Sequence, residues 1–179
     1  MPKGYLCLVL HAHLPYVRHP EDEHFLEEKW LYEAITETYI PLIKVFENLA
    51  NDGIKFRLTL SLSPTLMSML TDPLLQNRYI KHLNILRELA AREVARTRKE
   101  QPEVHQCALM YQELFETAYK TFHYEYKNNL LNAFKKYQDE GYLEIITCGA
   151  THGYLPLLGI QKQTSYAQIK TALDYYKEI

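Results

Sequence analysis

The sequence lacks a long apolar run, and it lacks an excess of charge of either sign. The first apolar run, residues 5–10, has six residues and is not followed by a small-residue cleavage site, so it predicts neither a signal peptide nor a membrane span. The 20 Lys and Arg residues and 22 Asp and Glu residues leave a net charge of −2. We therefore expect no nucleic acid and no membrane among the partners.

The sequence is also poor in cysteine and contains no Cys-x-x-Cys pair. Its three cysteines, Cys7, Cys107 and Cys148, are odd in number and far apart, which predicts a protein of the reduced cytoplasm. Hydrophobic residues make up 47% and charged residues 23% of the 179 residues, proportions that are typical of one folded domain. We therefore expect a globular, cytoplasmic domain.

Three segments share one pattern, in which a glycine precedes an apolar run that ends in small or polar residues. The runs predict strands near Tyr5–Leu10, Lys55–Leu62 and Leu143–Thr147. Gly53 and Gly141 also follow helical patterns directly, where glycine supplies the left-handed conformation that ends a helix. Helix, glycine and buried strand in this order indicate a parallel sheet.

Helical patterns fill the segments between these runs. Apolar side chains recur at helix spacing over residues 26–50, with Pro41 as a kink or break, Ser63 is placed as a helix N-cap, and a final helix begins near Thr164. Residues 64–140 far exceed the dozen or so that a crossover needs, so they predict a helical insertion. The expected fold class is α/β: a partial (β/α) barrel with three parallel strands and a large helical insertion between strands two and three.

The carboxyl ends of the three expected strands carry histidines and hydroxyls. These residues are His11, His13, Ser61, Ser63, Thr151 and His152. Alternate residues of a strand share a face, and parallel folds bind ligands at this end, so His11 and His13 are expected on one rim with His152. A lone histidine is more often a hydrogen-bonded core residue, but a His-x-His pair at a strand end favours a ligand, either a metal ion or a sugar.

The sequence has no Asp or Glu at an expected strand end, since Glu144 lies at the beginning of its strand. A metal-dependent barrel hydrolase also begins with His-x-His, but zinc or iron needs further ligands, and His152 is the one obvious candidate. We therefore expect no metal, no cofactor and no carboxylate pair for glycoside hydrolysis in this chain. Trp30, the only tryptophan, is equally compatible with a helix face packed on the barrel and with a platform for a sugar ring.

Three segments resemble the N-terminal part of glycoside hydrolase family 57, especially its α-1,4-glucan branching enzyme subgroup. They are "HAHLPYVRHPE", "EEKWLYEAITETYIPLI" and "EIITCGATHGYLPLL", in the order of the family. The resemblance implies that residues 1–179 are the N-terminal portion of a seven-stranded (β/α) barrel, with 64–140 as the helical insertion within it. It further implies a retaining activity on α-glucans and no metal requirement.

The resemblance also implies roles for particular residues. His11, His13 and His152 would line the subsite that holds a glucosyl unit, and Trp30 would be a nearby aromatic. The nucleophilic glutamate of the family lies on the fourth strand and the acid/base aspartate further along, and this chain ends before both.

The expected function is therefore that of the N-terminal region of an α-glucan-active hydrolase or transglycosylase, of the branching or amylase type, without its catalytic carboxylates. The expected ligand is an α-glucan or a maltooligosaccharide. Two alternatives stay open: a non-catalytic glucan-binding module, and a metal-dependent barrel hydrolase that uses the His-x-His pair. The third strand also predicts self-association through an open sheet edge.

Overall fold

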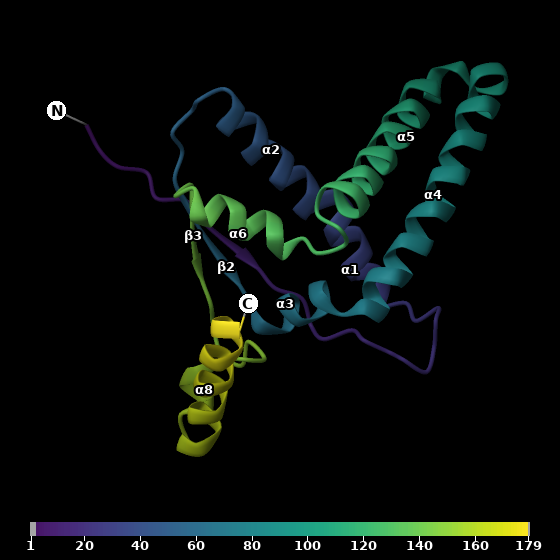
Figure 1. Cartoon of the computed structure of the whole chain (residues 1–179). Coiled ribbons are helices and arrows are strands. Elements are labelled where there is room, and N and C mark those ends of the chain that lie inside the picture. Colours follow the sequence, from purple (N-terminus) through teal and green to yellow (C-terminus); the bar gives the residue numbers. More distant parts are fainter. Residues whose placement is uncertain (1–2, 179) are drawn as a thin grey trace.

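The computed structural model describes residues 3–178, so Met1, Pro2 and Ile179, the last residue of the expected final helix, lie outside the described residues. The elements in chain order are β1 Val9–Ala12, α1 Glu28–Ala34, η1 Ile35–Tyr39, α2 Ile40–Asn51, β2 Leu58–Leu62, α3 Pro64–Thr71, α4 Pro73–Glu100, η2 Pro102–Val104, α5 His105–Tyr119, η3 Lys120–Glu125, α6 Leu131–Asp139, β3 Leu143–Ile146, α7 Leu155–Leu158 and α8 Lys162–Glu178 (Figure 1).

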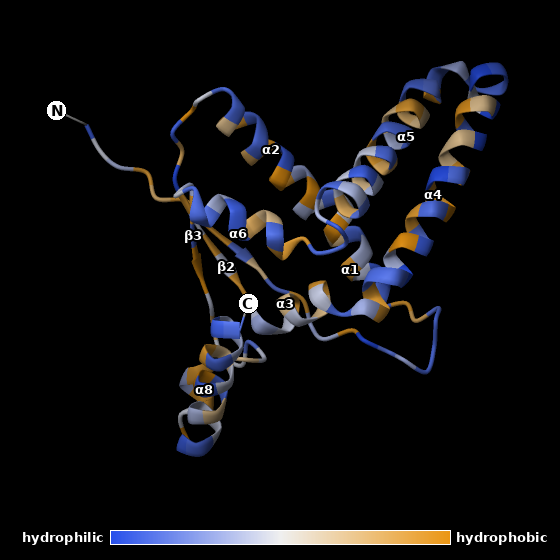
Figure 2. Ribbon diagram, in the orientation of Figure 1, coloured by the Kyte–Doolittle hydropathy of each residue, from blue (hydrophilic) through white to orange (hydrophobic). Residues whose placement is uncertain are grey.

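Within residues 3–178 the strands form one parallel sheet in the order β1-β2-β3. Val9 pairs with Thr59 and His11 with Ser61, and on the other side of β2 Ser61 pairs with Ile146. The strands carry mostly apolar residues (Figure 2), as expected where helices cover a parallel sheet. The three parallel strands predicted from the sequence are confirmed.

The first strand was predicted too early in the chain. It begins at Val9 and ends at Ala12, whereas Tyr5 and Leu6 are 95% and 84% exposed. The reason is the length of its neighbour, because β2 begins at Leu58 and pairs with β1 from Thr59 onward. The N–H of Thr59 donates to the carbonyl oxygen of Leu8 at 3.0 Å, so residues 5–7 have no strand to pair with in the described sheet. As a result His11 is a residue of the strand itself and not of the loop after it.

The expected helix over residues 26–50 is present in three parts. A π-helical segment, η1, separates α1 from α2 and ends at Tyr39, two residues before Pro41, which lies in the first turn of α2. Proline has no N–H to give to the preceding turn and its ring crowds that turn, so a local widening of the helix relieves the conflict. The predicted break at Pro41 therefore takes the form of a π segment followed by a new α-helix.

The helices between β2 and β3 fall into two groups. The long helices α4 and α5 lie side by side and extend away from the sheet (Figure 1), whereas α3 and α6 pack against each other, and α6 packs against β3 and α2. Phe46 of α2, Phe134 and Tyr137 of α6, and Leu60 and Leu62 of β2 are all almost fully buried in this layer. The core that holds the sheet in place is therefore formed by α2, α3 and α6. Within residues 3–178 no helix has both the length and the apolar character needed to cross a bilayer.

Candidate functional site

The three histidines predicted to share a rim are in contact with one another. Nε2 of His11 on β1 lies 2.7 Å from Nε2 of His152 in the segment after β3, and the two ring centroids are 4.6 Å apart. The ring of His13 meets that of His152 edge-on, with centroids 4.3 Å apart. The parallel sheet creates this histidine cluster, because it brings the carboxyl ends of β1 and β3 to the same edge.

The side chain of His13 is fixed by the start of helix α3. Its Nδ1 lies 2.8 Å from the hydroxyl oxygen of Ser63, which also accepts the N–H of Leu66 at 3.3 Å as the N-cap of that helix. The hydroxyl of Thr65 lies 3.3 Å from the same Nδ1. The hydroxyl of Ser63 also lies 3.1 Å from that of Thr65, so it can donate to His13 or accept from it, according to the tautomer of the ring.

Positive charge on His13 is disfavoured. Partial burial of His13 lowers the pKa of its imidazole, and the neighbouring His152 and His11 lower this pKa further. In the contact between His11 and His152 one imidazole donates and the other accepts, so at least one of these two rings is neutral. A neutral imidazole has one donor and one acceptor, which suits sugar hydroxyls.

The segment that carries His152 has an unusual backbone. His152 has φ +56°, in the left-handed region that non-glycine residues seldom occupy, and its N–H donates to the carbonyl oxygen of Gly149 at 2.8 Å. A side chain on Gly149 would meet Oε1 of Gln168 at 3.1 Å, so this turn lies close against α8. Strained backbone of this kind is often found at binding sites, where it orients one side chain.

The three hydroxyls expected at the rim have different surroundings. Ser63 contacts His13, as described above, and Ser61 is buried. The hydroxyl of Thr151 accepts from Nε2 of Gln168 at 2.8 Å and is thus held by α8. Thr151 therefore has its hydroxyl bonded to an amide of the last helix, whereas Ser63 has its hydroxyl at the histidine cluster. A surface hollow of about 390 Å³ borders the cluster and is lined by Tyr16, Pro64, Thr65, Ser68, Ala150, Thr151, Thr171 and Tyr175.

The structure does not bring Trp30 into the histidine cluster. Trp30 lies on α1 and is 46% exposed, and within residues 3–178 its ring has no aromatic contact with His11, His13 or His152. Its exposure argues against the interpretation of Trp30 as a fully packed helix-face residue. The indole is available to a ligand or to another part of a larger protein.

Among the strands of residues 3–178, the one carboxylate lies at the opposite end of the sheet from the cluster. Glu144, at the start of β3, accepts a hydrogen bond from the hydroxyl of Thr59 at 2.9 Å, at the amino ends of the strands. In the described part of the chain no group of three or more His, Cys, Asp or Glu side chains is arranged to hold a metal ion.

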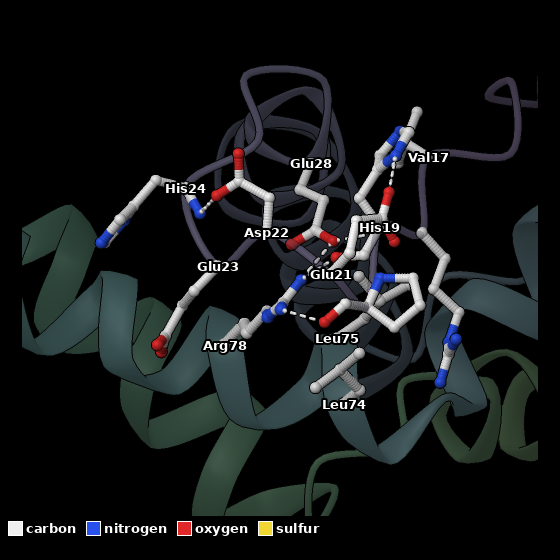
Figure 3. Close-up of polar contacts among 12 residues, drawn as sticks. Val17, His19, Glu21, Asp22, Glu23, His24, Glu28, Leu74, Leu75 and Arg78 are labelled. Atoms are coloured by element: carbon white, nitrogen blue, oxygen red, sulfur yellow. Dashed lines mark hydrogen bonds and ion pairs between the residues drawn. The ribbon is translucent and has the colours of Figure 1, made fainter.

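Sequence reasoning missed one buried polar contact, that of the carboxylate of Glu28 with its partner Arg78 (Figure 3). A signal was present, because Glu28 stands at helical spacing with Leu31, Tyr32 and Ile35, which form the buried face of the helix. A charged residue on an apolar helix face predicts a buried partner of opposite charge, because an unpaired buried charge is costly. The partner itself, 50 residues along the chain, carried no comparable signal.

Comparisons with known proteins find matches over nearly the whole chain. Residues 7–179 match Glycosyl hydrolase family 57. The chain is similar to a 1,4-α-glucan branching enzyme of Thermococcus kodakarensis, with 33% identity over 176 residues, which is 98% of this chain and 25% of that protein.

Two crystal structures superpose on the chain. The α-amylase AmyC from Thermotoga maritima is 49% identical with a TM-score of 0.90, over 96% of this chain and 32% of that one. The GH57-type branching enzyme from Pyrococcus horikoshii is 34% identical with a TM-score of 0.89, over 99% of this chain and 32% of that one. The chain thus spans between a quarter and a third of the length of these relatives. Because the family match covers nearly all of its residues and begins just before the His-x-His strand, the chain belongs to glycosyl hydrolase family 57.

Proposed function

We propose that this chain provides part of the glucan-binding cleft of a family 57 enzyme that acts on α-glucans by branching, transfer or hydrolysis. In this proposal residues 1–179 are the N-terminal portion of a seven-stranded barrel, and residues 64–140 are a helical insertion within it. The similarity to a branching enzyme and to an α-amylase supports α-glucan as the substrate class. The unpaired cysteines at positions 7, 107 and 148 support the cytoplasm as the compartment, where glycogen-like polymers would be the natural substrate.

The observation that carries the proposal is the contact among His11, His13 and His152. Three imidazoles at the carboxyl edge of a parallel sheet offer hydrogen-bonding groups from fixed directions, since Ser63 holds His13 and the turn with a positive φ holds His152. Sugar hydroxyls need this kind of paired donor and acceptor. We place Trp30 beside the bound glucan as an aromatic surface, which its exposure on α1 supports.

The chain alone is expected to bind glucan without turning it over. Glycosyl transfer with retention needs a nucleophilic carboxylate about 5 Å from a carboxylic acid, on opposite sides of the scissile bond. Within residues 3–178 the carboxylate on a strand, Glu144, lies at the amino ends of the sheet. A non-catalytic glucan-binding module is the second candidate, and the same observation favours it.

The test is a titration of the purified chain with maltohexaose, followed by the fluorescence of Trp30 and by calorimetry. We expect weak binding of maltohexaose and none of cellohexaose, whose β-linkages present the hydroxyls in a different geometry. Replacing both His11 and His13 by alanine should abolish this binding, since each removes a donor and acceptor at the rim. His24→Ala, a change of an exposed histidine in the loop before α1, is the matched control and should bind as the parent does.

Two results would contradict the proposal. Unchanged maltohexaose affinity in the double His11→Ala, His13→Ala variant would remove the cluster from the binding site. Release of reducing sugar or formation of branches from amylose by the isolated chain would show that a carboxylate pair is present after all.

A further inference from the structure

The first turn of α1 and helix α4 are joined by a buried ion pair (Figure 3). Nη1 of Arg78 lies 2.6 Å from Oε1 of Glu28, and the two side chains are 8% and 1% exposed. Withdrawing two charges from water is costly, and an apolar pair of similar size often stabilises a fold as well. An ion pair does, however, fix the positions of the groups that it contacts, because carboxylate and guanidinium both form hydrogen bonds at defined angles.

The pair holds the backbone of His19 from both sides. The N–H of His19 donates to Oε1 of Glu28 at 3.0 Å, and its carbonyl oxygen accepts from Nη1 of Arg78 at 2.8 Å. The second carboxylate oxygen of Glu28 accepts from the hydroxyl of Tyr32 at 2.9 Å. The backbone N–H and carbonyl oxygen of His19 are thus both hydrogen-bonded, one by a carboxylate and the other by a guanidinium. We call this ion pair the Glu28–Arg78 clasp.

Neighbouring residues anchor the same loop to the helices after β2. The backbone N–H of Val17 donates to the sulfur of Met69 on α3 at 3.3 Å. Nε of Arg18 donates at 2.7 Å to Asp72, which caps α4. The loop that follows His13 is therefore held against α3 and α4 at consecutive positions, and the clasp is the point at which it is also tied to α1.

Along the chain, Glu28 of the clasp lies between the two parts of the proposed binding surface. His13 stands at the beginning of the loop, and Trp30 follows Glu28 by two residues on the same helical turn, with its side chain exposed. We propose that Glu28 and Arg78 are positioning residues, which fix the first turn of α1 and thereby the place of Trp30 relative to the histidine cluster. The inference rests on the proposed function in one respect, that the ligand facing Trp30 is an α-glucan.

The experiment uses Trp30 as its own reporter, because it is the only tryptophan of the chain. Glu28→Gln keeps the size of the side chain and removes its negative charge. Arg78→Lys keeps the positive charge and removes the planar guanidinium group with its several N–H donors. Glu116→Gln is the matched control, because it breaks the ion pair of Arg87 between α4 and α5. For each variant we would measure circular dichroism, thermal unfolding, acrylamide quenching and anisotropy of Trp30, and maltohexaose affinity.

In Glu28→Gln and Arg78→Lys we expect lower anisotropy and greater quenching of Trp30 at temperatures where circular dichroism shows a folded chain. Maltohexaose binding should weaken about 2- to 30-fold, the range seen for residues that act on a ligand without touching it. Glu116→Gln should lower the midpoint of thermal unfolding without changing Trp30 or the affinity. If Glu28→Gln does not fold, Arg78→Lys decides by the same measurements.

Two outcomes separate this inference from the proposed function. If both clasp variants unfold at lower temperature but leave Trp30 and the affinity as in the parent, the clasp is only structural and the inference is wrong. If the parent binds no maltohexaose while the clasp variants still loosen Trp30, the positioning role stands and the glucan assignment fails.

Discussion

The hydroxyl of Ser63 shows how one residue serves both the fold and the site. Its oxygen accepts the backbone N–H of Leu66 as a helix cap and lies 2.8 Å from Nδ1 of His13. The cap was predictable from Ser63 standing directly before Pro64, but the contact with His13 was not, because it joins residues 50 positions apart. At the scale of a residue, hydrogen bonds between neighbours in the chain can be predicted from the sequence, and those between distant residues cannot.

Buried tyrosines give a residue-scale prediction of stability against pH. Burial raises the pKa of Tyr39 to about 12, and burial also raises the pKa of Tyr79. A group whose pKa is higher in the folded protein stabilises it fully below the unfolded pKa near 10, and this contribution is lost as pH rises towards the folded pKa. We expect the free energy of unfolding in urea to fall steeply between pH 10 and 12, with Tyr39 responsible for at most about 3 kcal/mol.

Tyr39→Phe tests this share of the pH dependence. The variant should lose less stability between pH 10 and 12 than the parent, whatever its stability at pH 8. Parallel curves for the two proteins over this range would show that Tyr39 does not ionise on unfolding.

At the scale of an element, the ends of helices α2 and α6 follow from single glycines. Gly53 and Gly141 have φ +69° and +78°, and the N–H groups of Ile54 and Tyr142 then donate to the carbonyl oxygens of Leu49 and Tyr137, both at 2.9 Å. These turns direct the chain into β2 and β3, as the repeated pattern predicted. The start of β1 did not follow from such a local rule, because the partner strand sets it.

Gly141→Ala should destabilise the protein by about 1 to 2 kcal/mol, the cost of the left-handed conformation for a residue with a Cβ. An added Cβ at Gly141 would meet no atom within 4 Å, so a packing clash does not contribute. Urea unfolding measures the change. Gly4→Ala, at a position with equally open surroundings and no positive φ, is the control and should leave stability within about 0.5 kcal/mol of the parent. Equal stability of the two variants would contradict the role given to Gly141.

At the scale of the whole molecule, the sheet places apolar surface at its outer strands. Within the described residues β1 and β3 lie at the two edges of the sheet, and Val9 and Ile146 are 58% and 41% exposed. Strand edges with exposed apolar side chains readily pair with another chain. Family 57 relatives are three to four times as long as this chain, so in such a protein further strands could cover these edges.

We predict that the isolated chain self-associates through these edges. Sedimentation velocity over a range of concentrations should show a species larger than the monomer that grows with concentration. Ile146→Lys puts a charge on the outer strand β3 and should reduce this association, whereas Ile85→Lys, at an exposed position on α4, should not. A monomer at every concentration would contradict the prediction.

The sequence by itself determined the features that depend on neighbours in the chain. Helix caps at Ser63 and Asp72, helix ends at Gly53 and Gly141, and the alternation that puts His11 and His13 on one face all follow from local sterics and hydrogen bonding. The resemblance of three segments to family 57 also fixed the family, because their residues and order are specific.

Only the tertiary structure decided which distant groups meet. His152 contacts His11 across 141 positions, Arg78 contacts Glu28 across 50, and Gln168 contacts Thr151 across 17. Such contacts depend on how the sheet orders its strands and how α4 and α8 lie against it. A buried charge or a hydroxyl forms a hydrogen bond with whichever group the packed elements bring within about 3 Å. The residues next to it in the sequence do not indicate which group that is.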